Sequence, residues 1–177
     1  MKRLLLLGAL LVGSTPRLLA QAGSWYPPGA DAAYPRTLLK AGELAGVRAS
    51  LAAPAQLALY RSLWADVQGA PPTDNTSASG RRARATWAKN AAFVVLLDRQ
   101  PGGGSSLAAL SAAQHDALVA SARGLLESLN PDVEVFATWS GTTPYTEWQW
   151  RSKELIDYLI AYDLLRGAGE TPASLAA

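Results

Sequence analysis

Apolar residues recur at helical spacing through most of the chain. The pattern predicts helices over residues 42–53, 54–68, 81–99, 112–129 and 147–166. Residue types that favour helix ends support these limits: Pro54 at a first turn, Ser111 at a cap, and Gly167 and Gly169 after the last helix. Residues 133–136 favour a short extended piece, and no alternating strand pattern of convincing length appears. The sequence therefore predicts an all-α fold in which neighbouring helices pack antiparallel.

The stretches between the predicted helices are rich in proline, glycine and small polar residues. Residues 23–36 are typical of an extended lead-in, 70–80 of a loop and 101–106 of a flexible break. Thr171 and Pro172 have the residue types of a cap and first turn of a further helix, although the sequence ends at Ala177. We therefore interpret the chain as the opening portion of a longer protein, with a natural C-terminus as the alternative.

The first 22 residues have the composition of a signal peptide. Lys2 and Arg3 form a basic start, and the apolar run over 4–13 is too short to span the ~30 Å core of a bilayer. Ala20-Gln21-Ala22 fits a cleavage site, so we expect removal of residues 1–22. The mature protein is then expected to be secreted or periplasmic, without a membrane anchor.

Charge and composition exclude several classes of function. The chain has 16 basic and 14 acidic residues, but Lys2, Arg3 and Arg17 lie in the signal, so the mature chain carries a net charge of −1. This balance gives no support for a nucleic-acid partner, which would need a basic surface. With no cysteine and one histidine, the residues cannot form a disulfide, a thiolate metal site or a multi-histidine metal site. We expect no metal and no other cofactor; the oligomeric state is left open.

The last predicted helix carries a broad apolar arc, formed by Leu155, Ile156, Tyr158, Leu159, Ile160 and Tyr162. An arc of this width predicts a helix packed against two neighbours, with Tyr158 and Tyr162 in the core. Asp163 falls inside the arc and needs a hydrogen-bond donor, for which Arg166 is the nearest local candidate. We interpret Asp163 as a satisfied anchor between helices rather than as a catalytic residue.

Polar residues also stand on the faces of two earlier helices. Asn90 projects between Val94 and Leu97, where it either bridges helices or faces a cleft that binds a polar substrate. His115 is interpreted as a packed or capping residue because it shares a face with Leu118, Ala122 and Leu126. Four basic residues spread around the helix over 81–99, which predicts a solvated surface for Arg81, Arg82, Arg84 and Lys89.

Aromatic residues gather where the polar segment before the last helix meets that helix. Tyr145, Trp148 and Trp150 offer faces on which sugar rings stack, and Gln149 and Arg151 can bond hydroxyls or a uronate carboxylate. These five residues, with Asn90, are the candidate substrate-binding residues. The alternative is a segment held in place by its own aromatic rings.

Three segments in this order resemble the N-terminal helical part of heparinase II/III-like and alginate-lyase-like polysaccharide lyases. They are YPRTLLKAGELAGVRASL (34–51), TWAKNAAFVVLLD (86–98) and ELIDYLIAYDLLRGAG (154–169). The resemblance covers most of residues 34–169 and implies that residues 37–177 form part of an incomplete (α/α) toroid of helical hairpins. Phe93 and the turn Ala161-Tyr162-Asp163 match packing positions of that scaffold.

The resemblance further implies β-elimination on an acidic polysaccharide. In such lyases an Asn or His neutralises the uronate carboxylate and a Tyr commonly acts as acid or base, because the proton removed is otherwise too weakly acidic. Those positions come after the segment that resembles 154–169, so no catalytic residue is assigned in this chain and the stretch alone is expected to be inactive.

The leading hypothesis is therefore the N-terminal helical part of an exported polysaccharide lyase whose partner is a uronate-containing polysaccharide. A non-catalytic secreted helical module that binds a glycan or a protein is the rival, and a helical exported domain without a ligand is the third possibility. The sequence does not select the polymer or the mode of cleavage.

Overall fold

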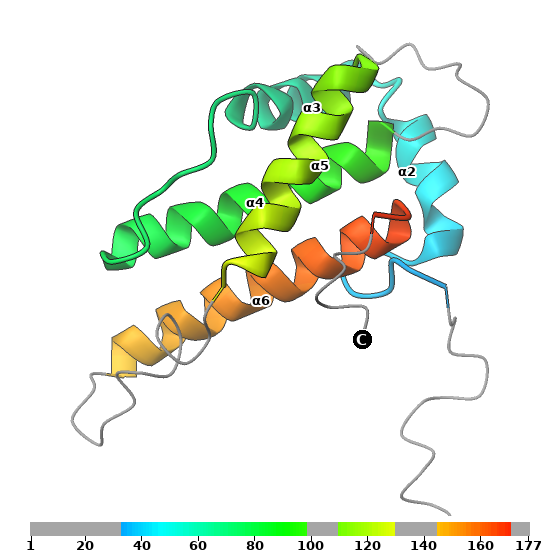
Figure 1. The fold of residues 1–177 in the computed structure, drawn as a ribbon. Coiled ribbons are helices and arrows are strands. Elements are labelled where there is room, and N and C mark those ends of the chain that lie inside the picture. Colours follow the sequence, from blue (N-terminus) through cyan, green and yellow to red (C-terminus); the bar gives the residue numbers. More distant parts are fainter. Residues whose placement is uncertain (1–32, 99–109, 130–144, 171–177) are drawn as a thin grey trace, which may run out of the picture. The chain divides into compact units, whose positions relative to one another are not determined.

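The computed structural model describes residues 33–98, 110–129 and 145–170, without the side chains of residues 145–148. Its elements are the 3₁₀ helix η1 (Ala41–Glu43) and the α-helices α2 (Leu44–Ser50), α3 (Pro54–Asp66), α4 (Ala78–Asp98), α5 (Ala112–Glu127) and α6 (Tyr145–Gly167) (Figure 1). The described residues form helices and connections without a strand, which confirms the all-α prediction. The toroid remains a prediction.

The helix ends follow local residue chemistry. Ser111 accepts a hydrogen bond from the backbone N–H of Gln114, whose side chain bonds back to the Ser111 N–H, so a capping box starts α5. After the end of α6, Gly169 has a φ of 79° and its N–H donates to the Arg166 carbonyl, while the Glu170 N–H donates to the Leu165 carbonyl. These two bonds form a Schellman motif, in which glycine best tolerates the left-handed conformation.

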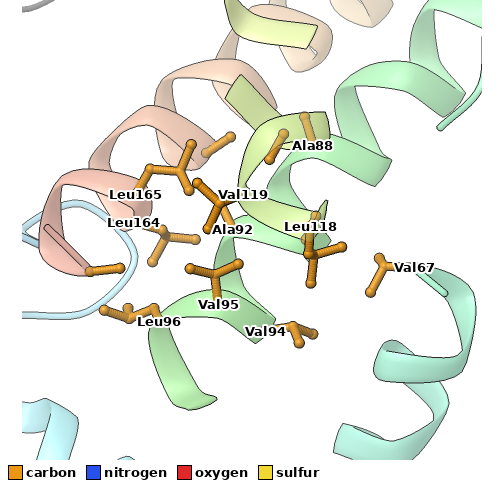
Figure 2. Close-up of a cluster of buried hydrophobic side chains, with 14 of the residues drawn as sticks. Val67, Ala88, Ala92, Val94, Val95, Leu96, Leu118, Val119, Leu164 and Leu165 are labelled. Atoms are coloured by element: carbon orange, nitrogen blue, oxygen red, sulfur yellow. The ribbon is translucent and has the colours of Figure 1, made fainter. Parts of the chain in front are cut away.

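Helix α4 is the centre of the core and packs against α3, α5 and α6. Its face toward them is lined by Val94, Val95 and Leu96, which meet Leu118 and Val119 of α5 and Leu164 and Leu165 of α6 (Figure 2). Several alanines of α4 and α6 have no exposed surface, and such small side chains let the helix backbones approach closely: Ala85, Ala88, Ala91, Ala92 and Ala161.

The segment before η1 is attached to the C-terminal half of α6 through Asp163. Its Oδ2 accepts from the backbone N–H groups of Arg36 (2.9 Å) and Thr37 (3.0 Å) and from the Thr37 hydroxyl (2.7 Å). The anchoring role predicted for Asp163 is confirmed, but Arg166 is the wrong partner. Arg166 instead bonds the Tyr162 hydroxyl at 3.2 Å and lies over the Tyr34 ring at 4.2 Å.

The apolar arc predicted for α6 is wrong in its N-terminal half. Ile156 and Leu159 are 53% and 55% exposed, whereas Glu154 and Asp157 are buried. The buried side follows an i+3/i+4 stripe instead, through Arg151, Glu154, Tyr158, Ala161, Leu165 and Ala168. Glu154 lies on this stripe and Asp157 beside it because Arg81 and Lys89 of α4 supply opposite charges at the same level, which offsets the penalty of burying the two carboxylates. Tyr158 is buried as expected, and Tyr162 is half-buried.

The solvated surface predicted for the basic residues of α4 is also wrong. Arg84 is buried, and its guanidinium donates to the Ser128 hydroxyl at 3.2 Å and to the Thr73 carbonyl at 3.4 Å. Arg81, Arg82 and Lys89 are half-buried. Long basic side chains reach partners on neighbouring elements while their stems cover apolar surface, so an even spread around a helix does not imply exposure.

Several sequence predictions lie outside the described residues. They are the signal peptide, most of the lead-in, the break at 101–106, the extended piece at 133–136 and the helix expected from Thr171.

Candidate functional site

A polar seam joins α4 to the N-terminal half of α6. Its centre is the Asp157 carboxylate, which accepts from Lys89 Nζ at 2.7 Å, Lys153 Nζ at 2.6 Å and the Thr86 hydroxyl at 3.1 Å. Burial alone would raise the pKa of Asp157, but the hydrogen bonds and charges of the two lysines outweigh burial and lower it. The carboxylate is thus held ionised, and its bonds fix α4 against α6.

A second contact extends the seam. Arg81 Nε lies 3.7 Å from Glu154 Oε2, and both side chains are nearly buried. Together the seam residues set which turn of α6 faces which turn of α4, a role that apolar contacts alone would fill less specifically. We define the polar seam as Arg81, Thr86, Lys89, Lys153, Glu154 and Asp157.

An open depression of about 390 Å³ lies beside the polar seam, lined by residues from α3, the connection after it, α4 and α6. We call it the α4–α6 depression. Its lining includes the cations of Arg82 and Lys153, the Asn90 amide, the Thr86 hydroxyl, the Trp87 indole and the Asp66 carboxylate. Its volume falls in the range of about 300–1,000 Å³ typical of small-molecule sites.

Arg82 connects the depression to an exposed aromatic ring. Its guanidinium carbon lies 4.7 Å from the centre of the Trp150 ring, a cation–π distance. Trp150 is 48% exposed, so part of its surface stays open to a ligand. Among the described residues, no carboxylate forms an ion pair with Arg82. Arg82 therefore holds a positive charge between an open indole and a polar depression.

The six residues that the sequence suggested for substrate binding occupy different positions in the structure. Asn90 lines the depression, Trp150 adjoins it through Arg82, and Gln149 is exposed beside Trp150 on α6. Arg151 is 4% exposed, so we do not assign it to the binding surface. The backbones of Tyr145 and Trp148 belong to α6, but their side chains lie outside the described residues.

Sequence reasoning missed Arg82, Thr86 and Lys153. Arg82 and Thr86 stand eight and four residues before Asn90 on α4, so the three share one helix face, and this spacing was a usable signal. Lys153 follows Trp150 by three residues on α6. Nothing in the sequence, however, says that these two helix faces meet, because the contact joins residues about 70 positions apart.

His115 lies away from this site, within α5. It is buried with Leu118, Ala122 and Leu126, which confirms the packed role. Its Nδ1 lies 3.6 Å from the Asp116 carboxylate.

Two further searches bear on function. Within the described ranges, no three His, Cys, Asp or Glu residues group closely enough to hold a metal ion. In the same ranges, none of the helices combines the length and apolarity needed to cross a membrane.

Comparison with protein-family models, with curated proteins and with solved structures gives no match for this chain.

Proposed function

We propose that this chain binds a uronate-containing polysaccharide and forms the N-terminal helical part of an exported polysaccharide lyase. The binding surface is the α4–α6 depression with the adjoining Trp150 ring. The observation that carries this proposal is Arg82, a cation without a carboxylate partner among the described residues, set between an exposed indole and a polar depression.

Each group in the depression has a complement in an acidic sugar. A uronate carboxylate pairs with the Arg82 guanidinium, whose planar fork of donors suits two carboxylate oxygens. The Asn90 amide donates to and accepts from ring hydroxyls, whereas the Thr86 hydroxyl already donates to Asp157 and therefore accepts from them. The apolar face of a sugar ring stacks on Trp150. In this arrangement one uronate of the polymer pairs with Arg82, and a neighbouring sugar of the same polymer stacks on Trp150.

Lys153 supplies a second cation. Its side chain is 45% exposed, and its ammonium has three donors, of which the Asp157 bond uses one. It can therefore keep Asp157 as a partner and still donate to a bound carboxylate. The lining holds two cations against the Asp66 carboxylate, which favours an anionic ligand over a neutral one.

Catalysis by β-elimination needs a group that neutralises the carboxylate and a base that removes the neighbouring proton. Arg82, Lys153 and Asn90 can supply neutralisation. No histidine or tyrosine is among the described residues that line the depression. We therefore assign this part of the chain to binding and propose that elimination uses residues elsewhere in the protein. The same observation favours the second candidate, a non-catalytic glycan-binding module.

Calorimetric titration with alginate and glycosaminoglycan oligomers tests the binding role. Arg82→Ala should weaken binding about tenfold, because a hydrogen-bonded ion pair contributes about 1.5–3 kcal/mol and 1.4 kcal/mol corresponds to tenfold. Arg61→Ala is the matched control, since Arg61 is exposed on α3 and does not line the depression. Equal affinities of the two variants, or no binding to any acidic oligomer, would refute the role.

Ultraviolet absorbance separates the two candidates when it is measured with the full-length protein that the lyase hypothesis expects. Elimination leaves an unsaturated uronate that absorbs, so new absorbance on incubation with an acidic polysaccharide supports the lyase. Binding that depends on Arg82 without new absorbance across a broad panel supports the non-catalytic module.

A further inference from the structure

A second cavity lies between the end of α3, α4 and α5. It measures about 200 Å³. We call it the Trp64 pocket. Its lining includes the indoles of Trp64 and Trp87, the amides of Gln68 and Gln114 and the hydroxyl of Ser121. Its volume is below the range of about 300–1,000 Å³ for drug-sized ligands, which suits a single ring.

The Trp64 pocket differs from the α4–α6 depression in charge. Its described lining contains no Asp, Glu, Lys or Arg, whereas the depression contains three such residues. A carboxylate in the Trp64 pocket would lose hydration without gaining a cation, which is costly. A neutral ligand with hydroxyls would find amide donors and acceptors on either side of aromatic faces.

Trp87 adds a donor without an acceptor. Its side chain is 7% exposed, and its Nε1–H has no hydrogen-bond partner among the described residues. Buried indole N–H groups usually have an acceptor, so such a group needs an explanation. That nitrogen has less than 1 Å² of exposed surface, so a ligand in the cavity does not reach it, and Trp87 contributes its apolar ring atoms to the lining.

We propose that the Trp64 pocket binds one uncharged sugar residue. Trp64 and Trp87 supply the faces for the apolar side of the ring, and Gln68, Gln114 and Ser121 bond its hydroxyls. Trp87 and Val67 line both cavities, which places the two sites next to each other. If the proposed function holds, on which this last step rests, the polymer contains uncharged as well as acidic residues, so a heteropolysaccharide fits better than a polyuronate.

Indole N–H resonances of the full chain report on the two sites separately. The sequence has six tryptophans, and single Trp→Phe variants assign the signals of Trp64 and Trp150. Titration with N-acetylglucosamine or methyl β-glucoside should shift the Trp64 signal saturably at millimolar concentrations. Glucuronate should shift the Trp150 signal and leave Trp64 unchanged.

Gln68→Ala should weaken binding of the neutral sugar about threefold to tenfold, as expected for the loss of one or two hydrogen bonds. Gln68 is exposed and follows α3, so the variant leaves the core intact, and Gln56→Ala on the exposed side of α3 is the matched control. A Trp64 signal that no neutral sugar moves, one that glucuronate moves equally, or an unchanged affinity in Gln68→Ala would overturn the pocket. A Trp150 signal insensitive to glucuronate would count against the proposed function alone.

Discussion

Replacing Asp163 by alanine should cost about 3 kcal/mol of unfolding free energy. The carboxylate is 3% exposed, and one of its oxygens accepts from three donors of residues 36 and 37. The substitution removes all three bonds and detaches the segment before η1 from α6. Because η1 and α2 follow this segment directly, the loss should affect the whole helical unit.

The magnitude follows from the environment of the donors. Hydrogen bonds to a charged group contribute about 1.5–3 kcal/mol each, but such values are not additive within one cluster. Each of the three donors left behind is neutral, and a donor left unsatisfied costs about 1–3 kcal/mol. Arg36 and Thr37 are exposed, so water satisfies part of what Asp163 leaves behind, which sets the expectation at the lower end of that range for each donor.

Equilibrium unfolding in urea measures this effect. At about 2–4 °C per kcal/mol for a chain of this size, the melting temperature should fall by about 6–12 °C. Thr37→Val keeps the shape but removes the 2.7 Å bond, and should cost about 1 kcal/mol. In the double variant, the Thr37 substitution should add almost nothing, because its acceptor is already gone.

Asp116→Ala is the control, since the side chain of Asp116 is 82% exposed and exposed substitutions usually stay within about 0.5 kcal/mol. A loss in Asp163→Ala that equals the control, or fully additive effects of the Thr37 and Asp163 substitutions, would refute the anchoring role.

Three other predictions concern stability. Gly167→Ala should destabilise the fold by about 1–3 kcal/mol, because a Cβ there would clash with Pro35 Cδ; a melting temperature equal to wild type would contradict the contact. The lowered pKa of Asp157, set by two lysines that outweigh burial, means that its stabilisation is complete above about pH 4 and is lost as the pH falls through that lowered value. The urea midpoint should therefore drop less steeply in acid for Asp157→Asn than for wild type, and parallel curves would exclude this source. Ser111→Ala should cost about 0.5–2 kcal/mol by removing the cap of α5, measured by urea unfolding, and no change would rule the cap out as a source of stability.

Local features of the fold were predictable from the sequence because the sequence encodes them locally. Pro54 at the first turn of α3, the Ser111 cap and the glycines that end α6 act within a few residues of themselves. Helix limits therefore agree closely with the pattern. In the central helix, Val94 and Leu97 are buried, as their place on the apolar face that carries Asn90 indicated.

The buried face of α6 was not predictable from periodicity. Ile156 and Leu159 belong to the apolar pattern and yet are exposed. Asp157 is buried because Lys89 and Thr86 of α4 donate hydrogen bonds to its carboxylate. A helical pattern records which residues are apolar, but the partners that make a charge burial acceptable lie far away in the sequence.

For the same reason, only part of the candidate site could be predicted from the sequence. Asn90 was visible as a polar residue on an apolar face, and Trp150 as part of an aromatic cluster. Arg82 and Lys153 stood among other surface-type charges, and only the meeting of α4 with α6 shows that they border one depression. Arg151 had the chemistry of a ligand-binding residue but is buried.

The most direct test of the proposed function compares one acidic polysaccharide with its carboxyl-reduced form. Reduction turns each uronate into a neutral sugar and leaves the length and linkages of the polymer unchanged. Because the α4–α6 depression offers Arg82 and Lys153 to a carboxylate, the native polymer should bind about tenfold or more tightly than the reduced one by calorimetry. Equal affinity for both forms, or no affinity for the native polymer, would contradict the account.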